Sequence, residues 1–140
     1  MGFRVGEKSK GKFPKNKKIR NATPLEIDGI QFKSKLEAFC YRHLKENKIE
    51  NEYEKNTFIL ITPFIYNGEK IRACTYTPDF VGSTWVIEVK GFSNDTFPIK
   101  NKMFKKHLLD NNILYDLYLP RNQKEVLESI QSIKSKLNKK

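Results

Sequence analysis

The chain has 140 residues, of which 38% are hydrophobic and 12% aromatic, so it can bury a core as a single domain and is not a disordered protein. Its 27 lysines and arginines outnumber its 16 acidic residues, which gives a formal net charge of +11. This charge favours a polyanionic partner such as a nucleic acid, although a basic protein without such a partner has the same composition.

The first 23 residues are rich in basic side chains and poor in hydrophobic ones. We predict that residues 1–23 form a flexible basic arm that orders on a nucleic acid, with a solvated tail of no function as the alternative. The predicted nucleic-acid contacts of this arm are Lys15, Lys17, Lys18 and Arg20. Residues 24–140 form the predicted folded domain.

The elements of the domain follow from its hydrophobic period and its turn residues. Residues 26–32 predict a short strand or a turn, and residues 34–47 a helix with one hydrophobic face. Residues 57–62 predict a strand, and Asn67-Gly68 a hairpin turn. The remaining predicted elements are strands over 71–76, 79–81, 85–90 and a buried strand over 113–119, and helices over 99–110 and from Asn122 to about Leu137. This order predicts an α/β fold in which a mixed central sheet is flanked by helices.

The two cysteines do not suggest a metal or disulfide framework. Cys40 lies on the hydrophobic face of the first predicted helix and Cys74 in a predicted strand, without the spacing of a zinc site. Free thiols fit a reducing compartment, and we find neither a signal-peptide pattern nor a hydrophobic run that could cross a bilayer. We therefore expect a cytoplasmic protein that needs no membrane and no small-molecule cofactor.

The residues with the strongest chemical signal are Asp79, Glu88 and Lys90. Alternate side chains of a strand share a face, so Glu88 and Lys90 point together while Trp85, Ile87 and Val89 point to the other face. Asp79 lies on the preceding strand, and pairing of the two strands can bring its carboxylate beside that of Glu88. Two close carboxylates repel each other unless a cation lies between them, and Mg²⁺ or Mn²⁺ suits such oxygen ligands.

Pro78-Asp79, separated by eight residues from Glu88-Val89-Lys90, resembles the signature of the PD-(D/E)xK nuclease superfamily. The resemblance covers about residues 32–119. It implies a restriction-endonuclease-like fold, a Mg²⁺ site for which Mn²⁺ can substitute, and cleavage of DNA. It also implies that Asp79 and Glu88 bind the metal together with the Val89 carbonyl, and that Lys90 is catalytic. Small phage nucleases described as Holliday-junction-resolvase-like or endonuclease-I-like carry similar segments.

In this superfamily a further acidic residue often comes from an upstream helix, and here the candidate is Glu37. The alternative role for Glu37 is a capping box, in which its carboxylate bonds back to the Ser34 backbone. Downstream, we expect a lysine group to cluster at the start of the next predicted helix, where it could hold the phosphate backbone, with a solvated helix face as the alternative. Its members are Lys100, Lys102, Lys105 and Lys106, and Phe97 precedes them.

The sequence therefore predicts a Mg²⁺-dependent DNA endonuclease with Glu37, Asp79, Glu88 and Lys90 as catalytic residues. The more specific hypothesis is cleavage of branched DNA or Holliday junctions during phage replication or recombination, which requires a homodimer because one site cuts one strand. A phage protein of this kind would act in the host cytoplasm. The alternatives are a sequence-specific restriction-like, transposon-end or repair nuclease, and a non-catalytic DNA-binding protein with the same fold.

Overall fold

The computed structural model of the chain describes residues 25–90 and 96–139. The predicted basic arm over residues 1–23, with Lys15, Lys17, Lys18 and Arg20, lies outside the described residues. The described part combines helices with short strands in the order expected of a mixed α/β protein. None of the described helices carries an apolar stretch that could span a membrane.

The first described helix, α2 (Lys35–Glu46), begins where its sequence predicts. The Ser34 hydroxyl accepts a hydrogen bond from the backbone N–H of Glu37 at 3.1 Å, which satisfies one of the free donors of the first helical turn. The helix ends at Asn47, whose N–H donates to the His43 carbonyl. Cys40 and Leu44 are fully buried on its inner face.

Four short strands form the central sheet in the order β11-β10-β9-β4. These strands are β4 (Glu52–Tyr53), β9 (Phe80–Val81), β10 (Trp85–Ile87) and β11 (Asp116–Tyr118). β10 runs parallel to β11 and antiparallel to β9, so the sheet is mixed. The turn between β9 and β10 requires Gly82, because a Cβ atom there would overlap the indole ring of Trp85.

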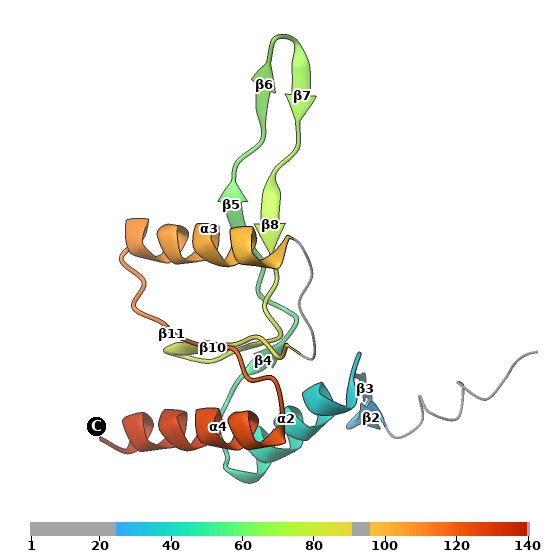
Figure 1. The fold of residues 1–140 in the computed structure, drawn as a ribbon, viewed down its shortest axis with the longest axis vertical. Helices are drawn as coiled ribbons and strands as arrows, with labels where there is room; N and C mark the ends of the chain where they lie inside the picture. The colour runs from blue at the N-terminus through green and yellow to red at the C-terminus, as the bar shows by residue number, and fades with distance from the viewer. Residues whose placement is uncertain (1–24, 91–95, 140) are drawn as a thin grey trace, which may run out of the picture.

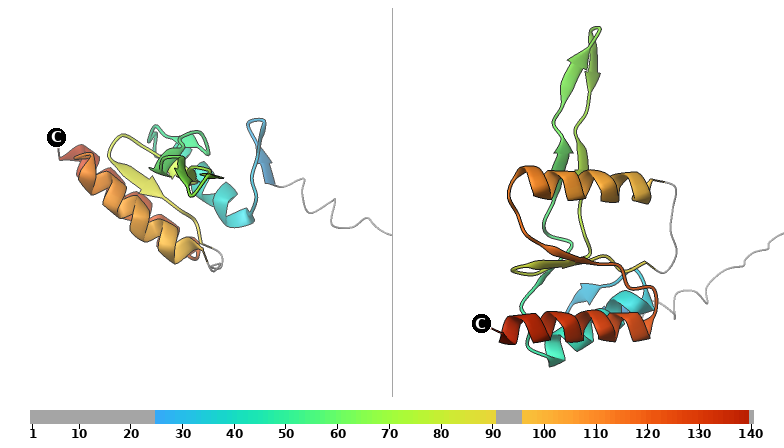
Figure 2. Two further views of the ribbon diagram at one scale, coloured as in Figure 1. Left: turned by 90° about the horizontal axis from the view of Figure 1, so that it is seen from above. Right: turned by 60° about the vertical axis from the view of Figure 1, so that its left-hand side comes forward.

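Helices cover both faces of this sheet. Helix α3 (Phe97–Asp110) lies on one side, and α2 with α4 (Gln123–Asn138) lies on the other (Figures 1 and 2). One core cluster joins Phe80, Trp85 and Ile87 to the side of α2 and α4, and a second joins Val81 and Val86 to α3. These two clusters confirm the predicted alternation of side chains between the faces of the sheet, because Trp85, Ile87 and Val89 belong to the first cluster and Val86 belongs to the second.

The remaining strands form ribbons rather than further strands of the central sheet. They are β2 (Glu26–Ile27) with β3 (Ile30–Gln31), β5 (Phe58–Ile61) with β8 (Cys74–Tyr76), and β6 (Phe64–Tyr66) with β7 (Glu69–Ile71). The β6–β7 turn has positive φ at Asn67 and Gly68, as the predicted hairpin turn requires. The β5–β8 ribbon leads into the β6–β7 hairpin, which projects well beyond α3 (Figure 1).

Several predicted elements differ from the structure. The strand predicted over 85–90 is assigned only as far as Ile87, and those over 57–62 and 79–81 are shortened by one or two residues. The strand over 71–76 is interrupted, because β7 ends at Ile71 and β8 begins at Cys74. The strand predicted over 113–119 is shorter and only half-buried, because β11 is an edge strand that pairs with β10 on one side alone. Helix α3 begins at Phe97, two residues earlier than predicted, with Pro98 in its first turn, where a missing N–H costs nothing.

Candidate active site

Asp79 lies just before β9, at the point where β9 and β10 diverge. Its carboxylate accepts a hydrogen bond from the backbone N–H of Val89 at 2.8 Å, in the place that a carbonyl of a continued strand would take. On the other side of β10, Lys90 still donates its backbone N–H to the Pro120 carbonyl, so the extended chain continues beyond Ile87. The Asp79 carboxylate is therefore fixed at the end of the sheet.

Asp79 is buried, with only 5% of its surface exposed. Burial is the main cause that raises the pKa of its carboxyl group from 3.8 to about 8, and the negative charges of Glu88 and Glu37 raise it further. The Glu88 carboxylate in turn accepts a hydrogen bond from the Asp79 backbone, so the two residues are neighbours. A cation that binds beside a buried carboxylate surrounded by other carboxylates therefore stabilises its ionised form.

Glu37 reaches the same place from the first turn of α2 and is 7% exposed. Its Oε1 accepts hydrogen bonds from the hydroxyl of Tyr53 at 2.5 Å and from the backbone N–H of Lys33 at 3.3 Å. The predicted bond back to the Ser34 backbone is replaced by the bond to Lys33, one residue earlier. Glu37 therefore both ties down the chain before α2 and faces Asp79.

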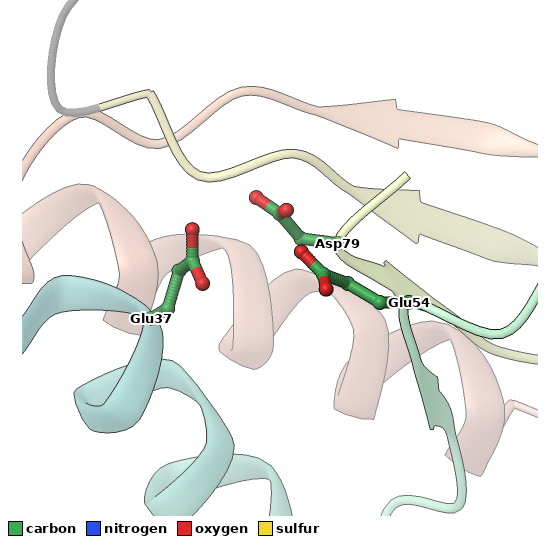
Figure 3. Close-up of side chains that lie close together, drawn as sticks. All are labelled: Glu37, Glu54 and Asp79. Carbon is green, nitrogen blue, oxygen red and sulfur yellow. The ribbon is translucent and has the colours of Figure 1, made fainter. Parts of the chain in front are cut away.

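The third carboxylate of the site is Glu54, which the sequence analysis did not identify. β4 pairs antiparallel with β9, and one residue beyond the assigned pairs the N–H of Glu54 donates to the carbonyl of Asp79 at 2.9 Å. The carboxylates of Glu37, Glu54 and Asp79 converge, with one oxygen of each within 4.8 Å of the others (Figure 3). Glu54 also has a φ of 52°, an uncommon conformation for a residue other than glycine.

The cation nearest to this carboxylate cluster is the side chain of Lys33. Its Nζ lies 2.6 Å from Glu54 Oε2, and the lysine side chain is 69% exposed. The hydrogen bond to Glu54 is the main cause that raises the pKa of Lys33, and the charges of Glu37 and Asp79 raise it further. One surface ammonium group therefore balances a part of the charge of three carboxylates.

Glu88 and Lys90 lie beside the cluster, on the face of the sheet that α3 covers. The hydroxyl of Tyr76 donates to Glu88 Oε1 at 2.6 Å. Burial raises the pKa of Glu88, while the Tyr76 hydroxyl and the charge of Lys90 act in the opposite direction. Lys90 is half-buried, and its Nζ lies 4.1 Å from the ring centre of Phe97. The Lys90 side chain therefore lies outside the core, over the Phe97 ring and close enough to Glu88 for its charge to act on that carboxylate.

The four predicted catalytic residues are brought into one region, but not as one ligand set. Glu37 and Asp79 belong to the carboxylate cluster, whereas Glu88 is its neighbour and Glu54 takes the third position. Val89 contributes its N–H to Asp79, and its carbonyl as a metal ligand stays a prediction. Only the register of β4 against β9 brings Glu54 here, and the sequence carries no separate signal for that register.

The lysines of α3 occupy different positions from those expected. Lys100 lies one turn after Phe97, the residue that contacts Lys90, and is half-buried. Lys102, Lys105 and Lys106 are exposed along the outer side of the helix. The expectation that all four lie at the helix start is wrong for Lys105 and Lys106, because α3 ends at Asp110, and Lys106 pairs with Asp110 at 3.0 Å.

A family model described as "Protein of unknown function (DUF1064)" matches residues 16–124. The chain belongs to this family. The DUF1064 match contains the three carboxylates of the cluster, Glu88, Lys90 and all of α3, and it ends just after α4 begins. No curated protein and no solved structure matches the chain.

Proposed function

We propose that the protein is a divalent-metal-dependent endonuclease that hydrolyses phosphodiester bonds in DNA. The observation that carries this proposal is the convergence of Glu37, Glu54 and Asp79 from three separate elements, with Glu88 and Lys90 alongside. Grouping three carboxylates disfavours their ionised forms, and the ammonium group of Lys33 offsets only a part of that cost, so the group fits a cation site better than a purely structural role. The arrangement of a mixed sheet between helices is compatible with a restriction-endonuclease-like fold, which is part of the proposal.

The donor set of the cluster fits Mg²⁺ or Mn²⁺. It consists of carboxylate oxygens without cysteine or histidine, which is the set that hard divalent cations prefer. Burial raises the pKa of Asp79, the charges of Glu88 and Glu37 raise it further, and a divalent cation beside the carboxylate would act in the opposite direction. When bound, the cation supplies a nucleophile at neutral pH and neutralises charge on the phosphate.

The protein itself contributes orientation and charge. Tyr76 holds Glu88 through a hydrogen bond to Oε1, and the ring face of Phe97 contacts the Lys90 ammonium group. The side chains of Glu88 and Lys90 are therefore restrained beside the cluster. We propose that Lys90 stabilises the negative charge that grows on the phosphate during hydrolysis. The half-buried position of Lys90 makes its charge more effective than that of an exposed lysine, because water screens it less.

The proposed substrate is branched DNA, with a four-way junction as the most specific case. The exposed lysines of α3 supply affinity for phosphates of any sequence, and junction cleavage would require two copies of the chain. Comparing cleavage of a four-way junction with that of its separate linear arms tests the substrate. Equal rates on both would favour a duplex-cutting nuclease.

The catalytic proposal is tested with wild type, Lys90→Ala and Lys124→Ala on junction, flap and linear DNA, with Mg²⁺, with Mn²⁺ and with a chelator. Lys124 is a matched control because its side chain is 84% exposed on α4. We expect Lys90→Ala to bind DNA but to cleave it about 100-fold more slowly. Lys124→Ala should cleave as wild type does.

Three results would contradict the proposal. If Lys90→Ala cleaves at the wild-type rate, Lys90 has no catalytic role. If the wild type binds DNA but never nicks it with either cation, the protein is a non-catalytic DNA-binding protein. Cleavage that persists in the chelator would point to a mechanism without the carboxylate cluster.

A further inference from the structure

The β6–β7 hairpin is the most exposed part of the described chain. All ten residues from 61 to 70 are solvent-exposed, and the hairpin stands clear of the sheet and of α3 in Figure 1 and in the right-hand view of Figure 2. A two-stranded hairpin without further packing is marginally stable in water. We call residues 62–73, the hairpin with its connections to β5 and β8, the β-arm.

The tip of the β-arm carries hydrophobic side chains that contact no core. Phe64, Ile65 and Tyr66 are 48%, 68% and 63% exposed. The register places Phe64 opposite Ile71 and Ile65 opposite Lys70, so aromatic and aliphatic groups occupy both faces of the tip. Consecutive exposed hydrophobic residues on a free strand favour aggregation, so their presence indicates an interaction surface.

Positive charge accompanies these hydrophobic groups. The charged residues from 62 to 73 are Glu69, Lys70 and Arg72. At the base of the β-arm, Lys102 and Lys106 of α3 line a hollow together with Leu60 and Ile61 of β5. The β-arm and the chain as a whole both carry net positive charge, which attracts a DNA backbone to this surface.

The β-arm is also directly connected to the candidate active site. Its second strand continues into β8, which ends at Tyr76, the residue that holds Glu88, and Asp79 follows three positions later. The rings of Tyr76 and Phe104 lie 4.9 Å apart, which anchors this end of the ribbon to α3. The eight residue-to-residue steps of extended chain from Gly68 to Tyr76 span about 25 Å, so the tip reaches DNA bound at the site several base pairs from the cut.

From this placement, we infer that the β-arm inserts its hydrophobic tip at the branch point of DNA bound in the site and thereby selects branched over linear substrates. The inference rests on the proposed function and names the element that gives it substrate preference. Unstacked bases at a branch point offer the exposed ring faces that Phe64, Ile65 and Tyr66 can cover, whereas a continuous duplex keeps its bases stacked.

The test compares wild type with the double variant Ile65→Ser, Tyr66→Ala. Both residues are exposed, so the fold does not depend on them. Leu114→Ser is the matched control, because Leu114 is 90% exposed in the loop between α3 and β11, away from the β-arm. Binding to a four-way junction and to a linear duplex of the same sequence is measured in a chelator, with a fluorescent adenine analogue at the branch point.

We expect the double variant to lose about tenfold in junction affinity and the fluorescence change of the branch-point base, with duplex affinity within about twofold of wild type. Leu114→Ser should change neither. Unchanged junction affinity, or an equal loss on junction and duplex, would overturn the inference. A wild-type dimer that becomes a monomer in the double variant, measured by sedimentation, would assign the β-arm to self-association instead and would also overturn it.

The chelator separates this inference from the proposed function. Binding is measured without cleavage, so a failure of the β-arm to recognise the branch leaves the Lys90 cleavage assay unaffected. Conversely, branch-selective binding by a protein that never cleaves DNA would support the β-arm and refute the nuclease.

Discussion

Replacing Asp79 by asparagine should stabilise the metal-free protein. Asp79 is 5% exposed and lies among other carboxylates, so its ionised form is disfavoured in the folded state. Asparagine has nearly the same shape, keeps an oxygen that can accept the Val89 N–H, and carries no charge. Its amide N–H groups can also donate to Glu37 and Glu54.

The size and sign of this effect follow from the pKa of Asp79. Folding raises it from 3.8 to about 8, so the stability that the protonated carboxyl provides is complete below pH 3.8 and is lost as the pH rises through about 8. At pH 7 Asp79 is ionised in the unfolded chain but still largely protonated in the folded protein. This difference lowers the free energy of unfolding by on the order of 4 kcal/mol relative to its value at low pH. If asparagine recovers about half of that cost, the melting temperature rises by roughly 8 °C.

The assay is thermal unfolding of wild type, Asp79→Asn and Asp110→Asn in a chelator at pH 5.5, 7 and 9. Asp110 is the matched control because its side chain is 53% exposed and pairs with the exposed Lys106, and such a surface pair contributes little to stability. The gain of Asp79→Asn should increase from pH 5.5 to pH 9. A variant less stable than wild type at pH 9, or a gain independent of pH, would refute the electrostatic reasoning.

Four further outcomes follow from the same structure. Mg²⁺ at ten times its dissociation constant should stabilise the wild type by about 1.4 kcal/mol in thermal unfolding and should stabilise Glu54→Gln less. Tyr76→Phe removes the hydroxyl that lowers the pKa of Glu88, so the acidic limb of the kcat/KM profile for DNA cleavage should move to higher pH. Gly82→Ala should destabilise the fold by about 1–3 kcal/mol in urea unfolding, because its Cβ would overlap the Trp85 indole. The logarithm of DNA affinity should fall linearly with the logarithm of salt concentration, as expected of phosphate contacts.

A specific result would contradict each of these predictions. Equal Mg²⁺ stabilisation of wild type and Glu54→Gln would remove Glu54 from the metal site. An unshifted pH profile in Tyr76→Phe would show that the hydroxyl does not control Glu88. Wild-type stability of Gly82→Ala would mean that the indole can move aside, and salt-independent binding would exclude the lysines as phosphate contacts.

Local sequence signals predicted the parts of the fold that depend on neighbouring residues. Ser34 caps α2, Asn122 caps α4 by accepting from the Glu125 N–H, and Asn67-Gly68 turns the β6–β7 hairpin. The period of two in residues 85–90 placed Glu88 and Lys90 on one face and the core residues on the other. These features are readable because a cap, a turn or a strand face is set by residues within a few positions of each other.

Only the tertiary structure decided which carboxylates meet. Glu54 joins Asp79 through the register of β4 against β9, and Tyr53 reaches Glu37 from 16 positions away. An alternating pattern fixes the face of a strand but not the residue opposite to it, so several registers fit the same sequence. The sequence by itself therefore determined the residue types of the site and their local orientation, whereas long-range pairing chose Glu54 over Glu88 as the third member of the cluster.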